Sequence, residues 1–221
     1  MWAAMSDTFS PELGRLVAGY RRFRANGWAS NRDRWADLRE GQEPQVMVIA
    51  CSDSRVDPSQ IFDVDPGEIF VVRNVAAMVP PFETTPGHHG VSAALEFAVQ
   101  FLKVKEIVVM GHGMCGGCKA ALTQEMRGFE PGQGGFVADW IALLDEARDE
   151  VARTHGIEGR PAERAMEQAG VKVSLQNLRT FPCIRSKERS GELKLSGAFF
   201  AISDGVLHVL DEGDGHFHAV E

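Results

Sequence analysis

Long hydrophobic runs are absent from the 221-residue sequence. No segment approaches the roughly 18 consecutive apolar residues that a membrane-spanning helix needs, so we expect no membrane span. The opening residues MWAAMSDTFSPELGRL also lack a basic region followed by an apolar stretch, which argues against a secretory signal. Together these absences predict a cytoplasmic protein.

The sequence has fewer basic than acidic residues. The chain has 23 Lys and Arg against 31 Asp and Glu, a formal net charge of −8. Such a protein repels phosphate groups, so neither nucleic acid nor a membrane surface is an expected partner. Internal repeats and low-complexity linkers are also lacking. The sequence therefore predicts one domain over residues 1–221, with an N-terminal helical arm over residues 1–40.

Cysteine is scarce, with four residues at positions 51, 115, 118 and 183. In a reducing compartment, such cysteines indicate metal binding or catalysis more often than disulfides. What they do depends on where the fold places them.

Three short apolar runs indicate the fold. The segments VMVIA (46–50), EIFVV (68–72) and EIVVM (106–110) are typical of strands buried on both faces. The segment between the last two, residues 88–102, carries apolar residues at helical spacing. This alternation predicts an α/β fold with a mostly parallel sheet flanked by helices. We expect further helices over 10–23, 31–40, 136–154 and 160–180, one starting near 117, and an antiparallel hairpin over 197–211.

Candidate metal ligands follow two of these strands. Cys51 ends the first run, and GHGMCGGC (111–118) follows the third. Because functional groups collect at the carboxyl ends of parallel strands, Cys51, His112 and Cys115 converge if these strands are neighbours. Two thiolates and one imidazole suit zinc, and three protein ligands leave a fourth position for chemistry.

Other interpretations of the same residues stay open at this point. Cys115 and Cys118 form a C-x-x-C pair, as in dithiol redox proteins. A phosphatase-like thiolate is disfavoured, because Asp57 stands where that loop needs an arginine. A non-enzymatic zinc or redox protein would leave Asp53 and Arg55 without a role. We therefore favour a zinc enzyme.

The segments CSDSR (51–55), PGEIFVVRN (66–74) and GHGMCGG (111–117) together resemble the zinc signature of the β-class carbonic anhydrases. The resemblance extends over most of the chain. It implies one zinc ion per chain, held by Cys51, His112 and Cys115. It also implies reversible hydration of carbon dioxide to bicarbonate and a proton, with Asp53 and Arg55 as the catalytic dyad that orients the attacking hydroxide.

The same resemblance implies a substrate pocket and an assembly. Gln42 matches a glutamine that donates a hydrogen bond to substrate, and Phe70, Val75 and Gly116 match positions that line the pocket. The family sheet has four parallel strands and an antiparallel edge strand. Its unit is a homodimer, often paired into homotetramers, with the helical arm laid across the partner.

Two further expectations concern variants of this chemistry. Val48 stands where some members have the tryptophan of a second bicarbonate site, although the matching arginine, Arg73, is present. This indicates the plant-like, open-site branch, in which Asp53 pairs with Arg55 and does not bind zinc. A hydrolase for a linear heteroallene such as carbon disulfide is the rival activity, because related scaffolds process such molecules.

Overall fold

The computed structural model describes residues 9–221, which form two compact units divided between Gln42 and Glu43. The first unit contains α1 (Pro11–Phe23), a π-helical turn η2 (Arg24–Trp28) and α2 (Arg32–Glu40). Ser10 begins α1 as predicted, because its hydroxyl accepts a hydrogen bond from the Leu13 N–H at 3.3 Å.

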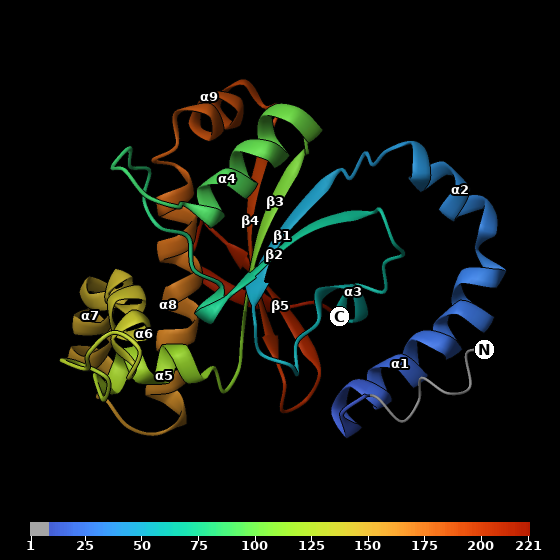
Figure 1. Ribbon diagram of the computed structural model, residues 1–221. Coiled ribbons are helices and arrows are strands. Elements are labelled where there is room, and N and C mark those ends of the chain that lie inside the picture. The colour runs from blue at the N-terminus through green and yellow to red at the C-terminus, as the bar shows by residue number, and fades with distance from the viewer. Residues whose placement is uncertain (1–8) are drawn as a thin grey trace. The chain divides into compact units, whose positions relative to one another are not determined.

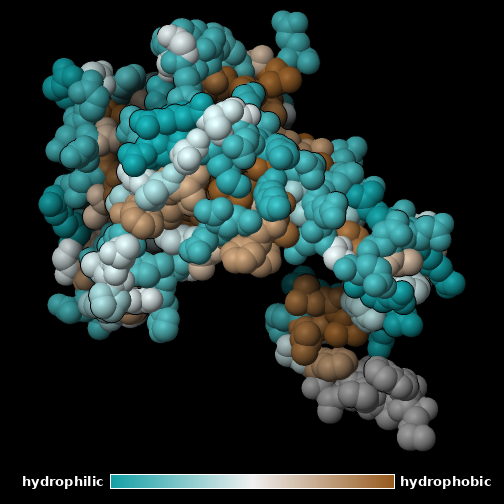
Figure 2. Space-filling model, turned by 90° about the horizontal axis from the view of Figure 1, so that it is seen from above, coloured by the Kyte–Doolittle hydropathy of each residue, from teal (hydrophilic) through white to brown (hydrophobic). Residues whose placement is uncertain are grey.

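Apolar side chains on α1 are exposed. Leu13, Leu16, Tyr20 and Phe23 are between 45% and 71% exposed. Figure 2 shows hydrophobic surface on this unit, whereas hydrophilic residues cover most of the visible face of the other. The spacing of these residues forms an amphipathic stripe along the helix predicted over 10–23, and neither α1 nor α2 contains a buried residue.

A six-stranded sheet forms the centre of the second unit, in the order β2-β1-β3-β4-β5-β6 (Figure 1). The strands are β1 (Val46–Cys51), β2 (Ile69–Asn74), β3 (Glu106–His112), β4 (Lys194–Ala201), β5 (Val206–Asp211) and β6 (His216–Ala219). The first four in this order are parallel, and β5 and β6 are antiparallel. The predicted α/β class is confirmed, although β6 adds a second antiparallel strand. Its polar residues give no strand signal, because β6 is an exposed edge.

Helices connect the strands. They are α3 (Pro58–Ile61), α4 (Gly90–Glu96), α5 (Gly116–Thr123), α6 (Gly135–Ile141), α7 (Asp145–His155), α8 (Arg160–Leu178) and α9 (Pro182–Ser190), with shorter turns η3 (Val75–Ala77), η4 (Phe97–Leu102) and η5 (Ala142–Leu144). The single helix predicted over 136–154 is wrong, because η5 separates α6 from α7. None of the helices in the described residues has the length and apolar character needed to cross a membrane.

The largest core lies on one face of the sheet. Side chains from β1 and β3 pack there against α4, η4, α8 and α9. Figure 1 shows α4, α8 and α9 on the same side of the sheet. The members of this core include Met47, Ile49, Ile107, Val109, Leu95, Val99, Val171, Leu175 and Ile184. Because these strands are covered on both faces, they are apolar throughout, which is why the sequence pattern predicts them.

Helix α8 approaches β3 closely at Gly111. A Cβ atom at Gly111 would lie 2.6 Å from Val171 Cγ2, closer than any side chain allows. Glycine is therefore required where the helix crosses the end of β3. This contact places α8 beside the residues that follow β3.

Candidate metal centre

The two strands that were expected to deliver metal ligands are neighbours. Strands β1 and β3 pair in parallel, so Cys51 and His112, at their last positions, reach the same edge of the sheet. Cys115 follows as the N-cap of α5. Ligand atoms of all three residues lie within 4.8 Å of one another, and all three residues are buried. The structure thus brings the predicted ligand set together.

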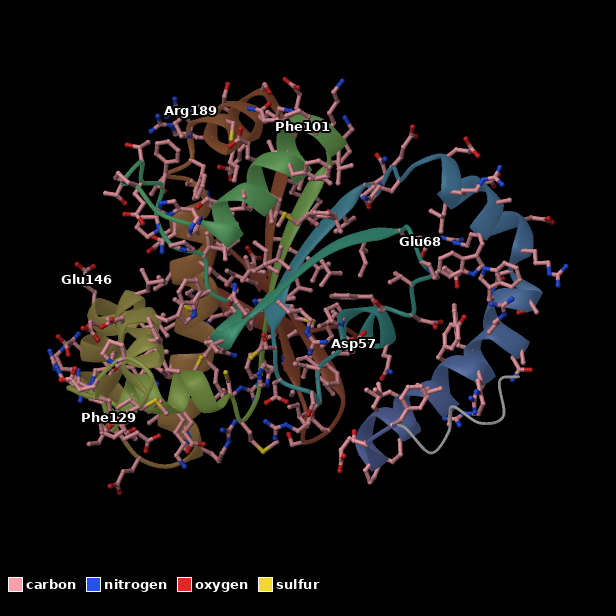
Figure 3. All side chains as sticks on the ribbon, viewed as in Figure 1. Asp57, Glu68, Phe101, Phe129, Glu146 and Arg189 are labelled. Carbon is pink, nitrogen blue, oxygen red and sulfur yellow. The ribbon has the colours of Figure 1, made fainter. Side chains whose placement is uncertain are left out.

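Figure 3 helps to locate this edge of the sheet. Asp57, which caps α3, lies near the carboxyl ends of the strands, and Phe101 of η4 lies near their opposite ends. The loops after β1 and β3 therefore share the end of the molecule at which α3 and α5 begin.

His112 has one nitrogen free to bind a metal. Its Nδ1 lies 2.9 Å from the carbonyl oxygen of Gly113, and the protonated nitrogen donates there. The tautomer that makes this bond leaves a lone pair on Nε2. Nε2 is buried and has no hydrogen-bond partner within residues 9–221. A buried polar atom without a partner is costly, so a ligand for Nε2 explains its position.

The thiols need a cation to ionise. The pKa of Cys51 is raised to about 12, first by the adjacent Cys115 thiol and then by burial. The pKa of Cys115 is raised to about 12, chiefly by Cys118. Burial alone would lower the pKa of His112, but the neighbouring Cys51 sulfur raises it. Two close, buried sulfurs and an unprotonated imidazole nitrogen are the donor set that zinc prefers, so these residues fit a zinc ion.

Asp53 and Arg55 form the ion pair expected from the sequence. Asp53 Oδ1 accepts from the Arg55 main-chain N–H at 3.0 Å and from Nε at 2.9 Å, and Oδ2 accepts from Nη2 at 2.7 Å. These bonds hold the pKa of the Asp53 carboxyl well below its usual range. Asp53 Oδ2 also lies 4.0 Å from His112 Nε2, so a carboxylate oxygen borders the candidate metal site.

Arg73 supports the loop that carries Asp53. From its place near the end of β2, it donates to the carbonyl oxygens of Cys51 at 2.9 Å and Asp53 at 2.6 Å, and to Asp57 Oδ2 at 3.0 Å. The sequence pattern singled out Arg73 only as the remnant of a second bicarbonate site. In the structure it joins the last residue of β1, Cys51, to Asp53 and Asp57 in the loop that follows.

Two of the predicted pocket residues lie beside the metal ligands. Gly116 is the first residue of α5, directly after Cys115, and a Cβ atom there would meet nothing within 4 Å. Val75 is 38% exposed, and its Cγ1 would lie 2.8 Å from a Cβ atom at Gly117. Val75 therefore contacts the start of α5.

Phe70 lies away from this site along β2, and the role of Gln42, which belongs to the other unit, stays a prediction. Phe70 pairs with Met47 on β1, whereas Cys51 pairs with Asn74. Four residues of strand put Phe70 about 13 Å from Asn74. Gln42 ends the first unit and lies outside the unit that contains the ligands.

Glu167 is a site residue that the sequence interpretation missed. It lies on α8, is 2% exposed, and its Oε1 accepts a hydrogen bond from the Cys115 N–H at 3.2 Å. The helical spacing of Glu167 from Val171 and Ser174 could have revealed it, because these three residues share the buried face of α8. A charged residue on an apolar helical face requires a buried partner.

The chain is similar to known carbonic anhydrases in sequence. The family model described as carbonic anhydrase matches residues 46–207. A curated carbonic anhydrase from Synechocystis sp. is 33% identical over 218 residues, which cover 95% of this chain and 77% of that protein.

Solved structures agree with the sequence match. The β-carbonic anhydrase CcaA has a TM-score of 0.88 at 31% identity, covering 96% of this chain and 93% of that one. A Coccomyxa β-carbonic anhydrase in complex with acetazolamide has a TM-score of 0.77 at 30% identity, with coverages of 91% and 87%. A structure from Sordaria macrospora, from work on two tetrameric β-carbonic anhydrases, has a TM-score of 0.78 at 26% identity, with coverages of 91% and 98%.

Proposed function

The chain belongs to the carbonic anhydrase family, in its β class, and on that basis we propose that it reversibly hydrates carbon dioxide to bicarbonate and a proton. Cys51, His112 and Cys115 would hold one zinc ion. The observation that carries the proposal is the buried ligand set, with the unpartnered His112 Nε2, directly beside the Asp53–Arg55 ion pair.

Zinc bound there supplies Lewis acidity, which lets water act as a nucleophile near neutral pH. Asp53 would accept a hydrogen bond from the attacking water and so orient its lone pair toward carbon dioxide. Arg55 keeps Asp53 ionised and fixes both of its oxygens, since Nε and Nη2 donate to different oxygens of the carboxylate. A structural zinc site has no use for such a pair, which favours an enzyme over a zinc-binding module.

Arg55 also connects the two loops beside the candidate metal ligands. Its Nη2 donates to Met114 O at 3.0 Å as well as to Asp53, so the guanidinium joins the loops after β1 and β3. This arrangement supports the open-site branch, in which Asp53 stays on Arg55. Val75 and Gly116 would line the space for substrate.

The proposal includes a homo-oligomer. The Sordaria structure comes from work on tetrameric β-carbonic anhydrases. Phe70 is too far along β2 to serve the ligands of its own chain, so its proposed role in substrate binding requires the site of a second copy. Gln42 remains the proposed hydrogen-bond donor to substrate.

A cytoplasmic location is proposed from the four cysteines, all of which are unpaired thiols.

Stopped-flow hydration of carbon dioxide on zinc-loaded protein tests the activity. We expect a rate well above that of the buffer, lost when a chelator strips the metal and restored when zinc is returned. Hydrolysis of carbon disulfide by a protein that does not hydrate carbon dioxide would overturn the proposal in favour of the heteroallene hydrolase. Inactivity of zinc-loaded protein on both substrates would overturn it in favour of a zinc-binding protein.

A further inference from the structure

Glu167 is a buried carboxylate that has no role in the proposed reaction. It is 2% exposed, on a buried face of α8 whose other members are apolar except for Ser174. Transfer of an ionised carboxylate out of water is costly unless charge and hydrogen bonds compensate. Its retention at this place therefore needs an explanation.

Arg160 supplies the compensating charge. It donates from Nη1 to Glu167 Oε1 at 3.1 Å and from Nη2 to Oε2 at 3.3 Å, in a two-pronged pair. The Arg160 side chain is 49% exposed and also bonds Glu163 Oε2 at 2.7 Å. These bonds raise the pKa of Arg160, so it stays charged. Glu167 is thus buried as one member of an ion pair that reaches solvent.

The remaining bond of Glu167 goes to a metal ligand. Its Oε1 accepts from the main-chain N–H of Cys115 at 3.2 Å. Cys115 is the N-cap of α5, so its N–H has no place in the hydrogen bonds of that helix. Glu167 is the group that satisfies this N–H.

The loop before Cys115 is one that needs support. Met114 has a φ of 58°, in the left-handed region that non-glycine residues seldom adopt. Its carbonyl oxygen accepts from Arg55 Nη2 at 3.0 Å, while the next N–H is held by Glu167. The peptide group that joins Met114 to Cys115 is therefore hydrogen-bonded at both its oxygen and its nitrogen. Arg55 donates to the oxygen, and Glu167 accepts from the N–H.

The fold fixes the position of Glu167 itself. Helix α8 touches β3 at Gly111, where Val171 leaves no room for a side chain. Arg160 Nη2 would lie 3.8 Å from a Cβ atom at Gly113. This close packing of α8 on β3 places the Glu167 carboxylate beside Cys115.

We propose that Glu167, held by Arg160, is a positioning residue that fixes the backbone of Cys115 and thereby keeps its sulfur in place to bind zinc. The inference rests on the proposed function for the metal itself. It adds a residue that acts on zinc retention through the ligand, without touching substrate. Such indirect partners of metal ligands typically change metal affinity about 10- to 100-fold when removed.

The test is the rate of zinc release from the full-length, zinc-loaded protein to an excess of a chromogenic chelator. Glu167→Ala removes the acceptor for the Cys115 N–H, and we expect release about 10- to 100-fold faster. Glu167→Gln keeps an oxygen for that N–H but loses the ion pair, so its rate should lie between those of wild type and Glu167→Ala. In the cobalt-substituted protein, the thiolate-to-metal absorption band should shift in Glu167→Ala, because the Cys115 sulfur moves.

Two control variants separate positioning from stability. Ser174→Ala removes another buried polar group of α8, one that bonds the Val79 N–H at 3.2 Å and no residue of the 113–115 loop. Glu163→Gln removes the other carboxylate on Arg160 and also makes no bond to the loop. Both should keep the wild-type release rate and absorption band, whatever they do to the urea midpoint.

The outcomes distinguish the inference from the proposed function. Wild-type protein that binds no zinc would overturn both. Wild-type protein that retains zinc, with Glu167→Ala releasing it no faster than Ser174→Ala, would overturn the positioning role and leave the metal site intact. Should Glu167→Ala fail to fold, Glu167→Gln decides alone, and a wild-type rate and band in that variant would overturn the inference.

Discussion

Within residues 9–221, two groups of side chains have the spacing of a metal site, and they differ in burial and in ligand chemistry. Cys51, His112 and Cys115 form one group, and Asp211, Asp214 and His218 form the other. In each group the candidate ligand atoms lie within 4.8 Å of one another. The first group is buried and joins two strands, whereas the second is exposed and lies within one hairpin, β5–β6.

The side chains of the hairpin group already have partners. Asp211 Oδ1 accepts from the Gly213 N–H and Asp214 Oδ1 from the His216 N–H, both at 2.7 Å. His218 Nε2 lies 2.8 Å from Asp214 Oδ2. These bonds are those of a tight turn.

The comparison shows that closely spaced Cys, His, Asp or Glu side chains are by themselves weak evidence for a metal site. In the buried group, His112 Nε2 lacks a partner and two thiols lie where water cannot solvate their charge. In the hairpin, the two carboxylates and His218 are exposed and already have local hydrogen bonds. Burial with an unsatisfied donor atom makes the first group the better candidate metal site, and the following predictions test that difference.

The largest effect should come from removing ligands in the two groups. We expect Cys51→Ala, His112→Ala and Cys115→Ala to lose zinc and activity together, because each removes one of three protein ligands. Asp214→Ala and His218→Ala should keep about one zinc per chain. Elemental analysis of the purified variants measures this directly.

Cys118→Ala is the matched control inside the buried group. Cys118 is 3% exposed and lies beside Cys115, yet it is outside the ligand set. It should retain zinc. Loss of zinc in Cys118→Ala, or its retention in Cys115→Ala, would reassign the ligands and favour the dithiol interpretation of the C-x-x-C pair.

The next effect concerns rate without loss of metal. Asp53→Asn should bind zinc as wild type does but hydrate carbon dioxide about 100-fold more slowly, because an amide cannot accept the proton of the attacking water as a carboxylate does. The same change in the hairpin, Asp214→Asn, removes an equal charge and should leave the rate unchanged. An undiminished rate in Asp53→Asn would remove Asp53 from the mechanism.

A smaller effect should appear in stability. Gly111→Ala forces a Cβ atom against Val171 and should lower the free energy of unfolding by about 1–3 kcal/mol. Gly215 in the hairpin has a φ of 75° but open space around it, so Gly215→Ala should cost about 1 kcal/mol. Urea unfolding of the zinc-loaded proteins compares them. Equal losses would mean that α8 can move away from β3.

The smallest effect concerns His208, on the hairpin side. Burial and then the charge of Arg164 lower its pKa, although Asp204 acts in the opposite direction. The unfolded chain therefore binds this proton more tightly. Stability from His208 is complete above its ordinary pKa of about 6.5 and falls as pH drops toward its folded-state pKa.

Proton NMR titration checks this expectation. The pKa of His208 should lie below its ordinary value in wild type and rise in Arg164→Gln, where the 3.4 Å approach of the Arg164 guanidinium to Nε2 is lost. A pKa that does not move in Arg164→Gln would leave burial as the sole cause.

The sequence by itself determined the local features of this protein. Apolar runs mark β1 and β3 because strands covered on both faces are mostly apolar. The run in β2 predicts a strand correctly, but its burial on both faces is wrong, because β2 is an edge strand whose residues are only partly buried. Cys51 and GHGMCGGC (111–118) directly follow such runs, so the sequence alone assigns the ligands to strand ends. The Asp53–Arg55 ion pair could also be predicted from the sequence, since its members are two residues apart. All of these features depend on neighbours in the chain.

Only the tertiary structure decided what depends on residues far apart in sequence. The adjacency of β1 and β3 turned three plausible ligands into one group. The register of β1 with β2 moved Phe70 away from that group, although the sequence pattern had assigned both to one pocket. Glu167 reaches Cys115 across 52 positions, by a bond that no local pattern encodes. Local sequence determines which helices and strands form. Packing between them determines which side chains come into contact, and the candidate metal centre consists of residues that are far apart in the sequence.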